Sequence, residues 1–168
     1  TTAAAWRGPC AFGDTASRTT VVLMGDSHAE HWLAALDRAG RERGWRVVLL
    51  VKPGCPVTTL PRLAHARRPS FQRDCAEFRE AMFRRIEAMR PAAIRRQTDS
   101  TAVAQEAAAR GLPVTLIDMN DRICATARCS PIVGGAVVFT DDNHLTATFS
   151  RSQGGVLGAR IAAAVALP

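Results

Sequence analysis

Short apolar runs alternate along the chain with longer segments in which apolar residues recur at helical spacing. The runs are rich in β-branched side chains, as is typical of strands that are buried on both faces of a sheet. They are Thr19–Met24, Arg46–Val51 and Pro113–Asp118. A further run, Pro91–Ile94, begins in the same way but stops abruptly at Arg95-Arg96-Gln97.

Helices are expected in the segments that lie between and after these runs. The segments with helical spacing are Ala29–Arg43, Phe71–Arg90, Thr98–Arg110 and Leu145–Ala166. Gly44 and Gly111 follow two of them as stop signals, and Gly154-Gly155 interrupts or delays the last. Strands that alternate with helices predict an α/β fold, a three-layer α/β/α sandwich around a mostly parallel sheet of about four to five strands.

The length of the chain is that of one domain. Residues 1–18 have no clear period and are expected to form a lead-in segment or linker, whereas residues 19–168 are expected to form a single domain. No stretch reaches the roughly 20 apolar residues that span a bilayer. The first residues lack the basic and apolar regions of a signal peptide, so we expect Thr1 to be a boundary within a longer protein.

Basic charge is the main bias of the composition. The net charge is +7, and arginine contributes most of the positive charge. Such a charge can favour nucleic acid or an anionic membrane or glycan surface. The arginines are spread over several helical segments, the chain has no Tyr, and no stripe of basic and aromatic residues occurs. We therefore expect solvated helix faces and no nucleic-acid partner.

Five cysteines suggest disulfides. Cys124 and Cys129 bracket a short polar loop, which suits a local disulfide. Cys55 and Cys75 flank a loop rich in Pro and Arg and could form a second disulfide. Disulfides imply an oxidising compartment outside the cytoplasm. Cys10 is then left over, with a partner that could lie outside this sequence; five unpaired thiols in a cytosolic protein are the alternative.

A serine lies where the first apolar run gives way to a helix. Ser27, in Gly25-Asp26-Ser27-His28, follows the carboxyl end of a strand, which is where open α/β sheets place their ligands. A serine hydroxyl is a weak nucleophile until a base takes its proton. His144 could be that base, with Asp141 holding its other ring nitrogen; Asp142 competes for this role.

An acyl-transfer site also needs donors for an oxyanion. The backbone N–H of Ser27 is one candidate and Gly54, after the second strand, is another, because glycine lets backbone approach a ligand closely. Two other interpretations compete. Asp26 or Ser27 could simply cap a helix. His28 and His31 could hold a metal with nearby carboxylates, but a helix surface needs no such ligand, so we expect neither metal nor cofactor.

These motifs resemble those of SGNH (GDSL-like) hydrolases, whose fold is flavodoxin-like. Four elements narrow the resemblance to SGNH domains fused behind the membrane-spanning acyltransferase-three family, whose members acylate bacterial cell-surface glycans. The elements are Gly25-Asp26-Ser27-His28-Ala29, Gly54-Cys55-Pro56, the Cys124-x4-Cys129 loop and Asp141-x-x-His144-Leu145-Thr146. The resemblance runs from about Val21 to Phe149, and implies Ser27 as nucleophile, His144 as base, Asp141 as its partner and Gly54 as second oxyanion donor.

The third strand along the chain, expected at Pro91–Ile94, departs from the family pattern. No Gly-x-Asn-Asp motif follows it, and the strand and its following loop look shortened. We assign no third oxyanion donor, because Asn120 and Asn143 are poor substitutes by position.

The expected function is that of an extracytoplasmic serine-dependent O-acyltransferase domain, on the periplasmic or cell-envelope face and tethered to the membrane in the full-length protein. A membrane-spanning acyltransferase domain in the same polypeptide would deliver the acyl group, which we expect to be acetyl. A glycan hydroxyl would then accept this group from Ser27. A stand-alone esterase with water as acceptor and a non-catalytic glycan-binding domain are the alternatives.

Overall fold

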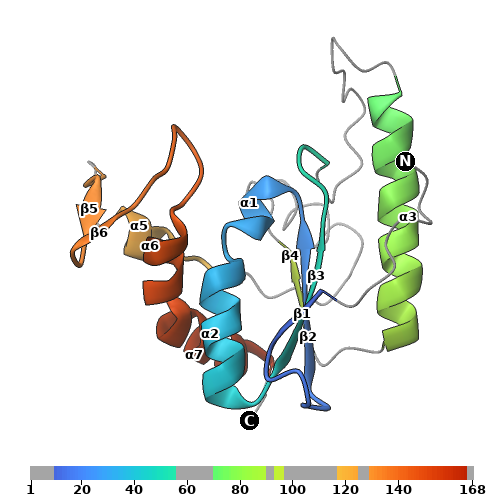
Figure 1. Ribbon diagram of the computed structural model, residues 1–168, viewed down its shortest axis with the longest axis horizontal. Coiled ribbons are helices and arrows are strands. Elements are labelled where there is room, and N and C mark those ends of the chain that lie inside the picture. Colours follow the sequence, from blue (N-terminus) through green and yellow to red (C-terminus); the bar gives the residue numbers. More distant parts are fainter. Residues whose placement is uncertain (1–9, 56–69, 90–92, 97–116, 125–128, 166–168) are drawn as a thin grey trace.

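The computed structural model describes residues 10–55, 70–89, 93–96, 117–124 and 129–165. Its central sheet has four strands in the order β1-β3-β2-β4 (Figure 1). Their bounds are β1 Ala11–Gly13, β2 Thr20–Gly25, β3 Arg46–Val51 and β4 Ala93–Arg96. Both β3 and β4 run parallel to β2, whereas β1 is antiparallel to β3. The sheet is therefore mostly parallel, with an antiparallel strand at one edge.

The two central strands end at the same level. Gly25, the last residue of β2, pairs with Val51, the last residue of β3. The Lys52 N–H then donates to the Gly25 C=O at 3.0 Å, which extends the pairing by one step. The segments that follow β2 and β3 consequently leave the sheet side by side.

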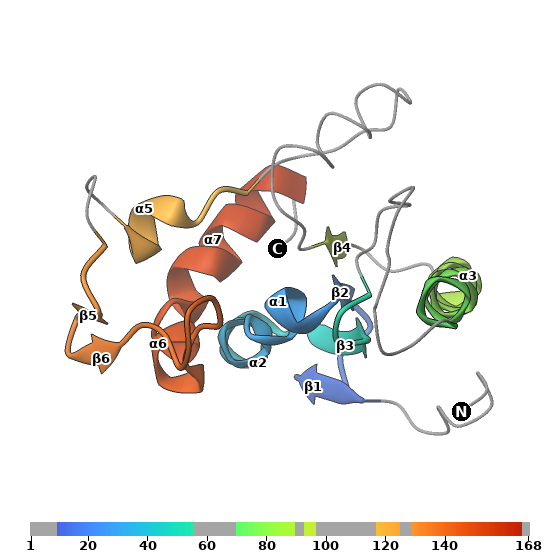
Figure 2. The same ribbon diagram turned by 90° about the horizontal axis from the view of Figure 1, so that it is seen from above.

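Helices cover both faces of the sheet (Figure 2). One face packs on α3, Phe71–Met89, whose Met82 and Ile86 contact the even-numbered core residues of β2 and β3. The opposite face packs on α2, Leu33–Arg43, and on α7, Gly154–Val165. Alternate residues of each strand point to opposite faces, so continuous apolar strands are what a sheet covered on both sides requires.

The helix expected at Ala29–Arg43 is divided in two. The first helix, α1, spans Ser27–Glu30 and starts early because the Asp26 carboxylate accepts the His28 N–H at 2.9 Å, as an N-cap does. A tight turn follows, in which the Trp32 N–H donates to the Ala29 C=O, and α2 then begins at Leu33. The Trp32 side chain is buried, and no glycine or proline marks this break.

The terminal helix is also divided. Helix α6 spans Ala147–Ser152, begins at the Thr146 side-chain cap, and is separated from α7 by Gln153. Gly154 lies against α2, where a Cβ would meet the Ala35 C=O at 2.8 Å. A glycine at this place therefore allows close packing of two helices.

Several elements differ from those expected from the sequence. Strand β4 continues through Arg95 and Arg96, where an abrupt stop was expected. The segment 119–140, expected to be mostly loop, contains α5, Asn120–Ile123, and a hairpin of β5, Ile132–Val133, with β6, Ala136–Val137. Strand β1 lies within the expected lead-in. These elements are only two to four residues long, too short for a period to be measured.

Two expected elements lie wholly or partly outside the described residues. The helix at Thr98–Arg110 lies outside the described residues, as do residues 113–116 of the expected strand at Pro113–Asp118. Ile117 and Asp118 belong to no strand. Within the described ranges, no helix is long and apolar enough to cross a membrane.

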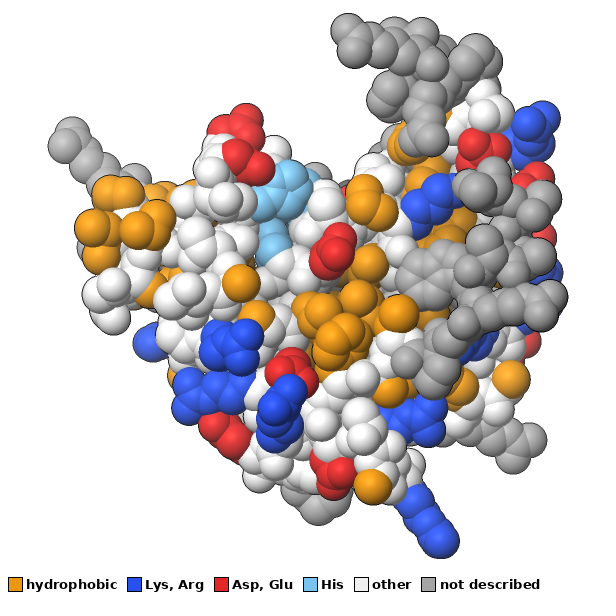
Figure 3. All heavy atoms as spheres, viewed as in Figure 1, with side chains coloured by type: hydrophobic (Ala, Val, Ile, Leu, Met, Phe, Trp, Pro, Cys, Tyr) orange, Lys and Arg blue, Asp and Glu red, His pale blue; other side chains and the backbone are white. Residues whose placement is uncertain are grey.

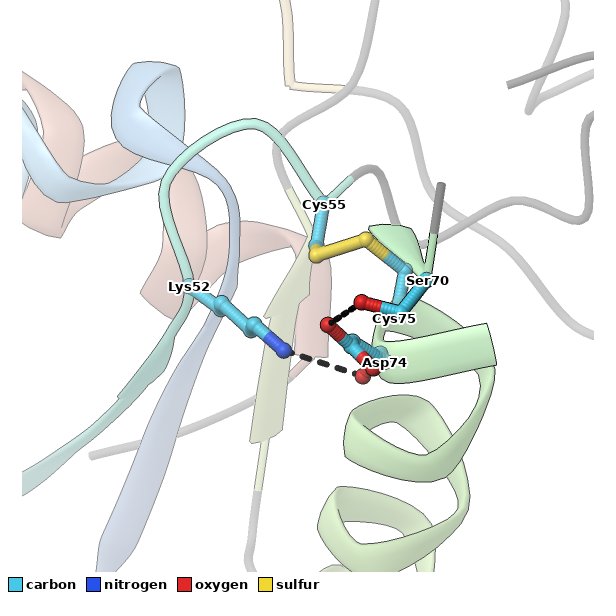
Figure 4. The surroundings of a disulfide bond; sticks show 5 residues. All are labelled: Lys52, Cys55, Ser70, Asp74 and Cys75. Carbon is cyan, nitrogen blue, oxygen red and sulfur yellow. Dashed lines mark hydrogen bonds between the residues drawn. A yellow bond between two sulfur atoms is a disulfide. The ribbon is translucent and has the colours of Figure 1, made fainter. Parts of the chain in front are cut away.

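Disulfides join Cys55 to Cys75 and Cys124 to Cys129. The first links the segment after β3 to α3 (Figure 4). Beside it, the Lys52 ammonium donates to the Asp74 C=O at 3.0 Å, and the Ser70 hydroxyl donates to the Asp74 carboxylate at 2.9 Å. Cys10 is a free, exposed thiol.

Candidate active site

Ser27 is the first residue of α1 and lies two residues beyond the end of β2. Its position depends on Asp26, which is extended and makes two contacts with α1. The Asp26 carboxylate accepts the His28 N–H, and the Asp26 C=O accepts the Glu30 N–H at 3.1 Å. The turn from strand to helix therefore fixes Ser27, half-buried, at the carboxyl edge of the sheet.

His144 reaches Ser27 from the other end of the chain. Its Nε2 lies 2.9 Å from the Ser27 Oγ, across a sequence separation of 117 residues. Its Nδ1 lies 2.8 Å from Oδ2 of Asp141 and 3.1 Å from Oδ1. A hydroxyl, an imidazole and a carboxylate in this order form the arrangement by which serine hydroxyls are activated in acyl-transfer enzymes.

Asp141 is held by the loop to which it belongs. Its Oδ1 accepts the backbone N–H groups of Asn143 at 2.9 Å and of His144 at 2.7 Å. These backbone hydrogen bonds, first that of Asn143, and then the His144 side chain, lower the pKa of Asp141 to about 2. The carboxylate is therefore ionised at neutral pH. Asp142 makes no comparable contact with His144 in the described structure.

The loop that carries these residues is itself closed. The Thr140 N–H donates to the His144 C=O at 2.9 Å, and Phe139 and Leu145 form an isolated antiparallel bridge. Half of the Asp141 side chain and a third of the His144 side chain remain exposed, so the site is open to solvent. Figure 3 shows histidine side chains in pale blue gathered next to acidic ones on one face of the molecule.

Two further histidines surround His144. The His28 ring stacks on the His144 ring with centroids 4.9 Å apart, and the His31 ring meets it edge-on at 6.2 Å. From the sequence, both were assigned to a helix surface. For His31 the spacing was a partial signal, because a residue four positions after Ser27 lies on the same side of a helical turn. No comparable signal pointed to His28.

Gly54 lies in the turn that follows β3. The Cys55 N–H donates to the Lys52 C=O at 3.0 Å, which closes this turn. Gly54 has a φ of 75°, and a Cβ there would meet Phe71 at 3.1 Å, so both conformation and space favour glycine. Because β2 and β3 end together, Ser27 and Gly54, which is exposed, both follow the same edge of the sheet. Neither backbone N–H has an acceptor among the described residues.

Among the described residues, none is placed as a third oxyanion donor. The Asn143 N–H is already bonded to Asp141, and the Asn120 N–H donates to the Asp118 carboxylate at 2.8 Å. Residues 97–116, which follow β4, lie outside the described part of the chain. Within that part, no three His, Cys, Asp or Glu side chains are placed to hold a metal ion.

Comparison with known proteins gives one family. The model of the SGNH domain (fused to AT3 domains) matches residues 1–95 and 88–157. The two parts overlap around β4, where the sequence departs from the family pattern. No curated protein and no solved structure matches the chain. Since the two matched parts extend over most of its length, the chain belongs to the family of SGNH domains that are fused to AT3 domains.

Proposed function

We propose that Ser27 is the nucleophile of an acyl-transfer reaction, with His144 as its base and Asp141 as the group that orients the base. The observation that carries this proposal is the 2.9 Å contact between His144 Nε2 and Ser27 Oγ, backed by the Asp141 contact on the opposite ring nitrogen. A helix cap alone would explain Ser27 but would need neither of these partners.

In the first half-reaction, the Ser27 oxygen attacks the acyl carbonyl carbon while its proton passes to His144 Nε2. The negative charge that develops on the carbonyl oxygen needs hydrogen-bond donors. We assign this role to the backbone N–H groups of Ser27 and Gly54, which no described residue occupies. The bond to the leaving group then breaks, the leaving group takes the proton from His144, and Ser27 is left acylated.

The second half-reaction runs the same steps in reverse with a new partner. An acceptor hydroxyl loses its proton to His144 as its oxygen attacks the acyl carbon. The bond to Ser27 breaks, and the serine oxygen recovers a proton from His144. The ionised Asp141 stabilises the imidazolium in both halves, because its negative charge faces Nδ1 at 2.8 Å.

We propose that the acceptor is a hydroxyl group of a cell-surface glycan. Membership in a family fused to AT3 domains supports an acyl donor supplied by a membrane partner domain. The two disulfides fit an extracytoplasmic domain. An esterase that uses water is the second candidate, and the exposure of His144 and Asp141 favours it, because water can reach the acyl group.

Labelling with a fluorophosphonate tests the nucleophile. We expect the protein and a Ser130→Ala control, which alters an exposed serine of the β5 region, to be labelled, and Ser27→Ala not to be. Labelling of Ser27→Ala at the rate of the parent would refute the assignment. A parent protein that is never labelled would instead favour the non-catalytic glycan-binding domain.

The acceptor is tested with p-nitrophenyl acetate, with and without added cell-wall glycan. A transferase should give acetylated glycan at the expense of free acetate. Rapid release of acetate with no modified glycan would favour the esterase.

A further inference from the structure

His31 contacts both segments that meet at the Ser27–His144 hydrogen bond. It follows α1 directly, and its backbone N–H donates to the Ser27 C=O at 3.1 Å. Its ring Nδ1 accepts the backbone N–H of Leu145, the residue after His144, at 3.2 Å. With the contact between His144 and Ser27, these hydrogen bonds close a ring of three.

No other hydrogen bond joins α1 to this loop in the described structure. The contacts made by Thr140 and Asp141 lie within the loop, so they fix its shape but not its place relative to Ser27. The Ala35 N–H donates to the Ser150 hydroxyl at 3.2 Å, but this bond joins α2 to α6, away from the site. Apart from packing in the apolar core and the stacking of His28 on His144, the bond between His31 and Leu145 is therefore the contact that sets the position of His144 relative to α1.

An imidazole can accept a hydrogen bond at Nδ1 only when that nitrogen carries no proton. His31 is surrounded by His28 at 5.7 Å, Trp32 at 5.8 Å and His144 at 6.2 Å between ring centroids. Burial, followed by electrostatic interaction with His28 and His144, lowers the pKa of His31 to about 4, although Asp26 and Asp141 act in the opposite direction. At neutral pH the ring is therefore uncharged, and its proton lies on Nε2.

We propose that His31 is a positioning residue, which holds the backbone of His144 in reach of Ser27 by accepting the Leu145 N–H. The inference rests on the proposed roles of Ser27 and His144. His31 touches no reacting atom. It acts because proton transfer requires a donor–acceptor distance of about 2.6–3.2 Å, and a small displacement of the base lowers the rate.

Two substitutions of His31, by Asn and by Gln, test the role of Nδ1 as hydrogen-bond acceptor. The carbonyl oxygen of Asn can occupy the place of Nδ1, whereas the longer Gln carries its amide at the place of Nε2. We expect His31→Gln to slow the maximal rate of fluorophosphonate labelling about tenfold, with little change in the inhibitor concentration for half-maximal rate. His31→Asn should stay within about threefold of the parent.

Ser150→Ala is the matched control, because it removes a hydrogen bond of the same length and kind between the same two halves of the chain. It should lower Tm but leave the labelling rate unchanged. If His31 only stabilised the fold, His31→Gln and Ser150→Ala would behave alike, and the proposal would be overturned.

Two NMR measurements test the hydrogen bond between Leu145 and His31 even if the protein does not react with the fluorophosphonate. Hydrogen exchange at the Leu145 amide should be faster in His31→Gln than in the parent and should be restored in His31→Asn. The imidazole ¹⁵N chemical shifts of the parent should show His31 protonated on Nε2 and unprotonated on Nδ1. This measurement needs no variant. The opposite tautomer, or unchanged exchange in His31→Gln, overturns the positioning role. A parent that is not labelled at Ser27 overturns the proposed function alone.

Discussion

At the scale of the residue, one substitution of Asp141 can separate its backbone hydrogen bonds from its charge interaction with His144. Its Oδ1 accepts two backbone N–H groups, and its Oδ2 faces the His144 ring. In Asp141→Asn, an amide oxygen can keep the backbone contacts, but the charge opposite His144 is lost. We expect the acylation rate to fall by about 10³- to 10⁴-fold in probe labelling. Tm at neutral pH should also fall, because the ionised carboxylate contributes to stability.

Asp142→Asn is the control for this substitution, because it removes the neighbouring charge without touching His144. It should label at nearly the rate of the parent. Equal losses in the two variants would contradict the assignment of Asp141 and would leave Asp142 as a candidate.

His31 gives the stability of the protein a dependence on pH. Its pKa is lowered to about 4 in the folded protein, against an ordinary value of 6.5, so the unfolded chain binds the proton more readily. The stability that His31 contributes is therefore complete above about pH 6.5 and is lost as the pH falls toward 4. We expect Tm to drop over this range, and to drop less in His31→Asn. Parallel curves for the two proteins would argue against this origin.

Asp141 is an acid whereas His31 is a base, but the stability that each contributes falls as the pH is lowered. Its folded pKa of about 2 lies below its ordinary value, so its contribution is present above about pH 4 and is lost only as the pH falls through 2. The two groups therefore act in separate windows, and the loss between pH 6.5 and 4 cannot come from Asp141.

At the scale of the element, two adjacent glycines of α7 have opposite surroundings. A Cβ on Gly154 would meet the Ala35 C=O at 2.8 Å, whereas a Cβ on Gly155 would meet only the end of the Glu42 side chain at 4.0 Å. Gly154→Ala should thus force α7 away from α2 and cost about 1–3 kcal/mol of unfolding free energy. Gly155→Ala should stabilise by about 0.5–1 kcal/mol, because alanine favours a helix.

Urea unfolding of both variants measures these changes through the midpoint at constant slope. Two changes of the same sign would mean that α7 does not pack on α2 as closely as the structure has it.

The elements also show what the sequence could predict. The buried strands β2 and β3 and the helix α3 follow from long apolar patterns, and their bounds agree closely with those expected. Short elements such as β1 and α5 have too few residues for a period to appear. The division at His31 and Trp32 escaped notice because it follows from a tight turn around a buried Trp32, not from glycine or proline.

The residues of the site were likewise predictable only in part from the sequence. Motif spacing was enough to single out Ser27, Asp141 and His144, which the structure brings into contact. The contacts of His28 and His31 with His144 depend on how a loop far along the chain folds back on α1, and periodicity carries no information about that.

At the scale of the whole molecule, the two disulfides close loops of different length. Cys55 and Cys75 are 20 residues apart, whereas Cys124 and Cys129 are only 5 apart. The loss of chain entropy in the unfolded state predicts about 3 kcal/mol of stabilisation from the first and about 2 kcal/mol from the second. We expect Cys55→Ala/Cys75→Ala to lower Tm more than Cys124→Ala/Cys129→Ala.

The longer bridge should also affect the chemistry, because Cys55 follows Gly54 directly. Probe labelling of Ser27 should be slower without the Cys55–Cys75 bridge and unchanged without the other. A larger effect from the Cys124–Cys129 pair would contradict the proposed place of Gly54 at the site.

Strand β1 covers one edge of the parallel strands. It pairs with residues 46–48 of β3 and thereby occupies hydrogen-bonding groups of that strand that would otherwise face solvent. An open, apolar strand edge is a template for aggregation. A protein trimmed to residues 19–168, the boundary that the sequence pattern suggests, would lose β1 and should self-associate in size-exclusion chromatography, whereas a protein that keeps residues 10–18 should elute as a smaller species. On this prediction, the few residues ahead of β2 serve to keep the protein soluble.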